Sequence, residues 1–193
     1  MSFDNPVEDV VDKAARFAIE AHSGQTRKSS NTPSVLHAME AASIVASLTE
    51  DRDVMAAAFL HDTVEDAGIS IETIGKEFGK KIQHLVASET ENKYRDMDSS
   101  LTWKQRKIES IEELKASEDI NVKMLWLADK LSNMRSFYRL HCVEGDRMWR
   151  YFNQKDPKEH EWYYRAVADA VSELDHSAAY REYVELINET FSN

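Results

Sequence analysis

The chain has 193 residues, of which 42% are hydrophobic and 31% are charged, a mix typical of a soluble globular protein. Its formal net charge of -11 argues against a nucleic-acid backbone as the main partner, and it contains no apolar run of the roughly 18 residues that a membrane span needs. The one cysteine, Cys142, excludes an internal disulfide framework, and without a signal-peptide pattern at the N-terminus we expect a cytoplasmic protein.

Helices dominate the predicted secondary structure. Only 5 Gly and 3 Pro interrupt the chain, and apolar residues recur at helical spacing through most of it. We therefore predict one all-α domain over residues 1–193, with helices at residues 5–22, 33–48, 54–66, 70–79, 81–90, 102–114, 122–140, 147–152, 158–174 and 177–191.

Two of the predicted helices begin with capping signals. Asn5, followed by a proline and then a glutamate, is expected to cap the first helix, and Thr102 is expected to open a capping box for the sixth. The many Lys and Glu residues of that sixth helix predict a face exposed to solvent.

The most informative stretch is His-Asp-Thr-Val-Glu-Asp at residues 61–66, which follows seven apolar residues. If the helix continues, His61 and Glu65 share one face and so do Asp62 and Asp66, because residues four apart lie above one another. A histidine directly after an apolar run needs a partner, since burial of an unpaired polar group is costly. Taken alone, the segment fits a solvated acidic helix end equally well.

Further metal-ligand candidates occur on two other predicted helices. His37 lies in the first turn of the second helix, and Asp129 interrupts the apolar stretch of the seventh. Together with His61 and Asp62, they form a set of two imidazoles and two carboxylates without a thiolate. Such a set suits a divalent ion such as Mn²⁺, Fe²⁺, Zn²⁺ or Mg²⁺.

Four motifs occur in a fixed order along the chain. They are Ala-His-Ser-Gly-Gln-Thr-Arg-Lys at residues 21–28, Pro33 with His37, Leu-His-Asp-Thr-Val-Glu-Asp at residues 60–66, and Leu-Ala-Asp-Lys-Leu-Ser-Asn-Met at residues 127–134. The adjacent His61-Asp62 pair resembles the hallmark of the HD metal-dependent phosphohydrolase superfamily. Over about residues 10–175 the chain resembles one member of it, the hydrolase domain of the RelA/SpoT alarmone family. Because no synthetase or regulatory domain follows, it is similar to the stand-alone small alarmone hydrolases.

The resemblance implies both a fold and an activity. The fold would be a single HD-domain helical bundle of about eight to ten helices. The activity would be that of a guanosine-3′,5′-bis(diphosphate) 3′-pyrophosphohydrolase, a Mn²⁺-dependent enzyme that removes pyrophosphate from ppGpp or pppGpp and leaves GDP or GTP. We expect a small guanosine nucleotide as its partner, no nucleic acid and no membrane, and a link to an alarmone synthetase only through the product.

The resemblance also implies roles for individual residues. The metal ligands would be His37, His61, Asp62 and Asp129, and the acids that orient and activate the attacking water would be Glu65 and Asp66. Substrate contacts would come from Arg27, Lys28, Lys93, Asn133 and Tyr163, with Tyr164 as the alternative to Tyr163. The chain departs from the family pattern at Ser34, Ala38 and Ser132, which we expect to affect substrate preference rather than catalysis.

Three other functions fit parts of the sequence. An HD phosphohydrolase could act on another nucleotide, such as ppApp, a deoxynucleotide, or NADPH losing its 2′-phosphate. A non-catalytic HD module could bind a nucleotide as a sensor or pair with a toxic alarmone synthetase, although such modules usually lose a ligand or the Glu65-Asp66 pair. A purely structural helical protein would have to place all of these residues by coincidence. The sequence does not indicate an oligomeric state.

Overall fold

The computed structural model describes residues 9–27, 30–91, 94 and 97–191. In this part of the chain the all-α prediction is confirmed, since the regular elements are ten α-helices and two short 3₁₀-helices. They are α1 Val10–Ala21, α2 Val35–Ala46, α3 Arg52–Leu60, α4 Thr63–Asp66, α5 Ile71–Phe78, α6 Lys80–Glu89, α7 Ser99–Ala116, α8 Ile120–Glu144, η1 Gly145–Tyr151, α9 Pro157–Ala170, η2 Ser172–Leu174 and α10 Ala178–Phe191. None of the helices in these segments is long and apolar enough to cross a membrane.

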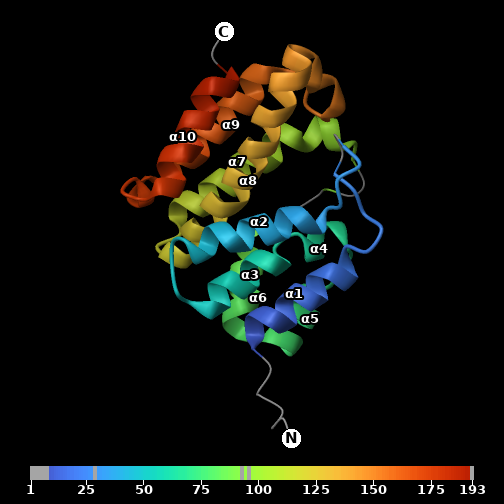
Figure 1. Ribbon diagram of the computed structural model, residues 1–193, viewed down its shortest axis with the longest axis vertical. Coiled ribbons are helices and arrows are strands. Elements are labelled where there is room, and N and C mark those ends of the chain that lie inside the picture. Colours follow the sequence, from blue (N-terminus) through green and yellow to red (C-terminus); the bar gives the residue numbers. More distant parts are fainter. Residues whose placement is uncertain (1–8, 28–29, 92–93, 95–96, 192–193) are drawn as a thin grey trace, which may run out of the picture.

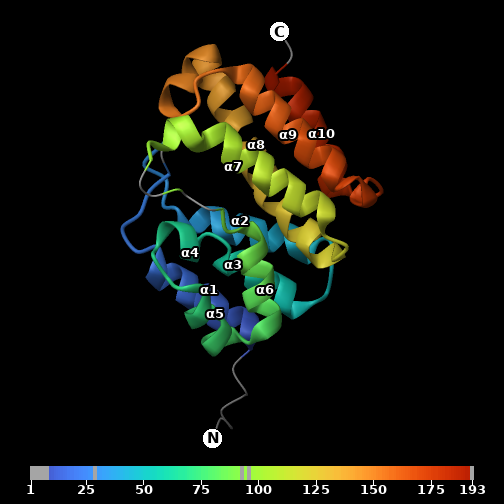
Figure 2. The ribbon, with the colours of Figure 1, turned by 180° about the vertical axis from the view of Figure 1, so that it is seen from behind.

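The helices form two groups that meet at α2 and α8. Helices α1 to α6 gather in the lower half of Figure 1, and α7 to α10 gather in the upper half. The long helix α8 packs against α2 and α3 on one side and against α10 on the other. In the view from behind, α7 runs in front of α8 and packs against α9 (Figure 2).

Helix α3 is the centre of the lower group because its middle consists of small residues. Ala56, Ala57 and Ala58 are all fully buried. With only methyl side chains at these positions, neighbouring helices can approach closely, and α1, α2 and α6 all pack against α3. This close packing fixes the carboxyl end of α3, where His61 follows.

Several helix starts differ from the prediction. The predicted cap Asn5 lies outside the described residues, and α1 begins at Val10, with the Asp9 carboxylate accepting the Val11 N–H at 2.8 Å. The Thr102 capping box is wrong, because α7 begins at Ser99 and Asp98 caps it. Thr102 lies inside the helix, and its hydroxyl donates to the carbonyl of Asp98 four residues earlier.

The helix that precedes the His-Asp pair does not continue through it. Helix α3 ends at Leu60, His61 and Asp62 form a turn, and the short α4 carries Glu65 and Asp66. The Thr63 hydroxyl donates to the Leu60 carbonyl at 2.6 Å, so a side chain satisfies an acceptor at the end of the helix. His61 and Glu65 therefore do not share a face of one continuous helix.

Candidate active site

Four candidate ligands meet where α2, α8 and the turn between α3 and α4 come together. The Nε2 atoms of His37 and His61 are 3.2 Å apart. Asp129 Oδ1 lies 2.8 Å from His37 Nε2 and 3.5 Å from His61 Nε2. Asp62 Oδ2 lies 3.6 Å from His37 Nε2 and 3.4 Å from His61 Nε2. The structure thus brings all four predicted metal ligands together.

Hydrogen bonds on the far side of each ring assign the tautomers of the two histidines. His61 Nδ1 faces the Ala58 carbonyl at 2.8 Å, which can only accept, so Nδ1 carries the proton. His37 Nδ1 faces the Ser132 hydroxyl at 2.8 Å, and that hydroxyl gives its one proton to Glu40 at 2.6 Å. His37 Nδ1 must therefore donate. In a neutral ring with its proton on Nδ1, Nε2 carries a lone pair, so both Nε2 atoms can bind either a proton or a metal ion in the space beside the carboxylates.

This arrangement of acceptors fits a cation. Two imidazole lone pairs and two carboxylate oxygens at these distances repel one another unless positive charge lies among them. Burial alone would lower the pKa of His61, but Asp62 and Asp129 outweigh burial and hold that pKa well above its ordinary value. The negative charge of Asp62 and Asp129 also favours a divalent ion, and imidazole nitrogens and carboxylate oxygens are suitable ligands for such an ion.

Three of the four candidate ligands, His37, Asp62 and Asp129, line a cavity of about 640 Å³, a size typical of sites that bind nucleotides or drug-sized molecules. Of the other predicted residues, those that line it are Arg27, Glu65, Asp66, Asn133 and Tyr163, and Tyr164 lines it as well. Lys28 and Lys93 lie outside the described residues.

Arg27 is connected to the ligands through Asn133. Arg27 Nη2 donates to Asn133 Oδ1 at 2.5 Å, and Asn133 Nδ2 donates to Asp129 Oδ1 at 2.7 Å. Neighbouring Gln25 donates from Nε2 to the backbone carbonyl of Asp66 at 2.9 Å. The loop between α1 and α2 is thus hydrogen-bonded both to α8 and to the short helix that carries the paired acids.

Glu65 is oriented by the segment that follows α6. Its Oε1 accepts the backbone N–H of Glu91 at 2.6 Å. The Glu91 carboxylate in turn pairs with Arg106 at 2.6 Å and Lys107 at 2.5 Å, both on α7. Burial opposes ionisation of Glu91, but Lys107 and Arg106 outweigh it and hold the pKa below its ordinary value.

The charged residues of α7 were predicted to form a face exposed to solvent, and for Lys107 this prediction is wrong; Arg106 beside it is largely buried as well. The side chains of Arg106 and Lys107 are only 11% and 17% exposed, and both line the cavity. Glu112, Glu113 and Lys115 on the same helix are exposed as expected. Composition alone could not separate the two faces, because charged residues occupy both.

A buried ion pair between Lys130 and Glu89 was also not predicted from the sequence. Lys130 donates to Asp129 and lies 3.5 Å from Glu89 Oε2, and both Lys130 and Glu89 line the cavity. Burial raises the pKa of Glu89 to about 8, although Lys130 opposes the shift. The position of Lys130 inside an apolar helix beside Asp129 was a usable signal. Glu89 offered none, because its partner lies 41 residues away in sequence.

Aromatic side chains form the far end of the cavity. Tyr163 is buried, and its ring packs edge-on against Trp103 at 6.1 Å between centroids. Its hydroxyl finds no hydrogen-bond partner among the described residues. Phe137 and His160 line the same end. A flat ring bound there would meet aromatic surface, and Tyr163 would have a free hydroxyl to offer it.

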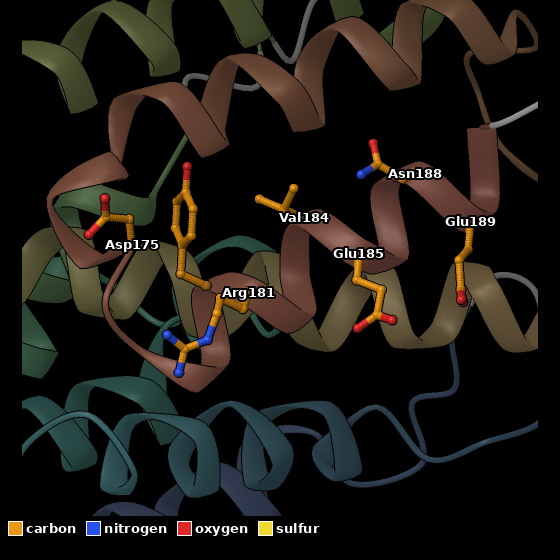
Figure 3. Close-up of a pocket in the computed structure, with 7 residues that line it drawn as sticks. Asp175, Arg181, Val184, Glu185, Asn188 and Glu189 are labelled. Atoms are coloured by element: carbon orange, nitrogen blue, oxygen red, sulfur yellow. The ribbon is translucent and has the colours of Figure 1, made fainter.

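A second hollow, on α10, contains none of the candidate residues. Figure 3 shows Val184 and Asn188 on one side of the helix, while Glu185 and Glu189 point away on the other. These side chains point in different directions, so they do not converge on a single ligand.

The fold and this site together define an HD-domain protein. The family model for the HD domain matches residues 14–147, so the chain belongs to the HD-domain family.

The predicted resemblance to RelA/SpoT proteins is confirmed by sequence relatives and by solved structures. The chain is 31% identical over 134 residues to GTP pyrophosphokinase of Myxococcus xanthus, covering 68% of this chain and 18% of that protein. It is 34% identical over 129 residues to GTP pyrophosphokinase rsh of Brucella ovis, covering 67% and 17%. It thus spans less than a fifth of the length of these relatives.

Two solved structures share the fold over most of the chain. One is described as a metazoan ortholog of SpoT that hydrolyzes ppGpp, with a TM-score of 0.76 and 25% identity over 96% of this chain and 97% of that one. The other is lmo0812 from Listeria monocytogenes, with a TM-score of 0.70 and 28% identity over 81% of this chain and 99% of that one.

Proposed function

We propose that the protein is a Mn²⁺-dependent hydrolase that removes the 3′-pyrophosphate from ppGpp or pppGpp and releases GDP or GTP. The observation that carries the proposal is the meeting of His37, His61, Asp62 and Asp129, three of which line a nucleotide-sized cavity. The solved structure described as a SpoT ortholog that hydrolyzes ppGpp matches 96% of this chain, and that match supports hydrolysis.

The charges in the cavity support a role for the metal in substrate binding. The described lining carries six carboxylates and four Lys or Arg side chains, a formal charge of -2 when every carboxylate, Glu89 included, is ionised. An anionic nucleotide is repelled by such a lining. A divalent ion held by the four ligands would cancel that charge, and when bound it would also polarise phosphate oxygens and lower the pKa of water.

Glu65 is the proposed proton acceptor. Its carboxylate lines the cavity, and the Glu91 N–H fixes one of its oxygens at 2.6 Å. In the proposed reaction, the oxygen of a water molecule bonds to the phosphorus attached to the ribose 3′-oxygen, and Glu65 takes a proton from that water. The bond from phosphorus to the 3′-oxygen breaks, the 3′-oxygen takes a proton from solvent water, and pyrophosphate is released. Asp66 would orient the water.

Arg27, Asn133 and Tyr163 are the proposed substrate contacts within the described residues, and Lys28 and Lys93 remain proposals from the sequence. A guanidinium can bridge phosphate oxygens or stack on a purine ring. The Tyr163 hydroxyl, which has no partner among the described residues, can bind a ribose or phosphate oxygen.

The test is product analysis on metal-stripped protein given ppGpp with and without Mn²⁺, next to the double variant His61→Ala/Asp62→Ala. We expect Mn²⁺-dependent release of pyrophosphate and GDP by the wild type and none by the variant. Turnover of ppApp, NADPH or a deoxynucleotide in place of ppGpp would replace the substrate in the proposal. Mn²⁺ binding without turnover of any of these would reduce the protein to a nucleotide-binding module.

A further inference from the structure

Ser132 connects a candidate metal ligand to a carboxylate outside the cavity. Ser132 lies on α8, is fully buried, and bridges His37 and Glu40, which are three residues apart on α2. His37 Nδ1 donates to the serine oxygen at 2.8 Å, and the serine hydroxyl donates to Glu40 Oε2 at 2.6 Å. The direction of the two bonds is fixed, because an ionised carboxylate can only accept.

The other oxygen of Glu40 is held in place by Arg135. Arg135 Nη1 donates to Glu40 Oε1 at 3.2 Å. The same guanidinium forms two bonds to the Glu182 carboxylate on α10, at 2.6 and 2.7 Å. A planar guanidinium that is fixed at both edges leaves Glu40 little freedom to turn away from Ser132.

The two histidines differ in how their rings are oriented. His61 is fixed by the backbone carbonyl of Ala58, one turn earlier, which no side-chain substitution removes. His37 depends on the side chains of Ser132 and Glu40 alone for its Nδ1 bond. A carboxylate that accepts from a ligand imidazole, directly or through a hydroxyl, holds the tautomer and strengthens the other nitrogen as a donor to metal.

We propose that Glu40 and Ser132 are positioning residues that hold His37 with its Nε2 lone pair toward a divalent ion, and so set the affinity of the site for that ion. The inference rests on the proposed function only in taking His37 as a metal ligand. Ser132 was expected to affect substrate preference. Its contacts place it behind the candidate ligand His37, and it is not among the described residues that line the cavity, so we assign it a role in metal affinity.

The test measures Mn²⁺ binding without any nucleotide. Metal-stripped wild type, Glu40→Ala, Glu40→Gln and Ser132→Ala are titrated with Mn²⁺, and free Mn²⁺ is followed by its electron paramagnetic resonance signal. We expect Glu40→Ala and Ser132→Ala to raise the Kd for Mn²⁺ by roughly 10- to 100-fold. Glu40→Gln keeps an oxygen that can accept from Ser132, so its loss should be under about tenfold.

Ser110→Ala is the matched control. Ser110 is also a buried helical serine, and its hydroxyl donates to the carbonyl of Arg106 at 2.9 Å, so it contacts none of the ligands. Its Kd for Mn²⁺ should equal that of the wild type. Circular dichroism checks that each variant is folded. If Ser132→Ala does not fold, the Glu40 variants decide, because the Glu40 side chain is 26% exposed and its replacement is better tolerated.

Unchanged Mn²⁺ affinity in Glu40→Ala would overturn the proposal. A wild type that binds one Mn²⁺ tightly but leaves ppGpp intact would contradict the proposed function. It would still support the positioning role of Glu40 and Ser132, provided that Glu40→Ala and Ser132→Ala bind the ion more weakly. A wild type that binds no Mn²⁺ would overturn both.

Discussion

The Nε2 atoms of His37 and His61 lie 3.2 Å apart, and both rings donate a hydrogen bond from the opposite nitrogen, Nδ1. With the Asp129 carboxylate 2.8 Å from one of these Nε2 atoms, the site requires positive charge, which a proton on an imidazole supplies without metal and a divalent ion supplies when it binds. The folded protein therefore contains a preformed site, and binding of a metal ion there should stabilise the fold.

Mn²⁺ should stabilise the folded protein. A ligand that binds only the folded state at 100 times its Kd adds about 2.7 kcal/mol, which for a chain of this size raises the Tm by roughly 5–10 °C. Thermal unfolding of metal-stripped protein with and without Mn²⁺ measures the effect. The double variant His61→Ala/Asp62→Ala should show no increase, and an equal increase in that variant would place the ion elsewhere.

Glu65→Gln should separate metal binding from catalysis. The amide oxygen can still accept the Glu91 N–H, so the fold and the Kd for Mn²⁺ should be retained. The amide cannot take a proton from water, and kcat should fall about 100-fold or more. Glu72→Gln, at an exposed position on α5, serves as the control and should keep full activity. A Glu65→Gln enzyme with near-normal kcat would remove Glu65 as the proton acceptor.

Arg27→Ala should weaken substrate binding more than it slows turnover. The guanidinium reaches the cavity beside Asn133, where it can contact a phosphate, and a charge-assisted hydrogen bond contributes about 1.5–3 kcal/mol. The KM for ppGpp should rise roughly 10- to 100-fold while the Kd for Mn²⁺ stays constant. Arg181→Ala on α10 is the control. Steady-state kinetics in which KM does not change would exclude Arg27 from the binding site.

Glu91→Gln should reduce stability in a way that depends on pH. At pH 7 the change leaves Arg106 and Lys107 without their carboxylate and should lower the free energy of unfolding by about 3 kcal/mol. Because the pKa of Glu91 is below 4.5 in the folded state, its contribution is complete above about pH 4.5 and is lost as the pH falls through the folded pKa. The difference from wild type should therefore narrow on acidification.

Urea unfolding at a series of pH values from 7 to below 4 measures that difference. Glu118→Gln, at an exposed position, should match the wild type throughout. A constant gap between Glu91→Gln and wild type at all pH values would mean that the ion pair is not the source of the lost stability.

The sequence was sufficient to predict most of the helices and to pick out the four candidate ligands that the structure brings together. His61 and Asp62 stood out because they follow an apolar run, and Asp129 stood out because it interrupts one. Their types, order and surroundings are local properties that can be read without coordinates. The helix predicted at residues 177–191 agrees closely with α10, Ala178–Phe191, because its apolar spacing is unbroken.

The remaining features depend on contacts between distant residues. The pairing of Glu91 with Arg106 and Lys107 requires knowing which side of α7 faces the cavity. The turn at His61 depends on how the Thr63 hydroxyl meets the carbonyl of Leu60. Ser132 and Glu40 are ordinary polar residues in sequence, and only the crossing of α2 and α8 brings them together.

The position of Trp103 gives the cavity an optical signal of its own. This indole is 7% exposed and lines the cavity, whereas Trp126, Trp149 and Trp162 are not among the described residues that line it. A purine ring stacked at the aromatic end would quench its fluorescence. Nucleotide binding could then be followed without a label in the inactive Glu65→Gln variant, and Trp103→Phe should abolish the change.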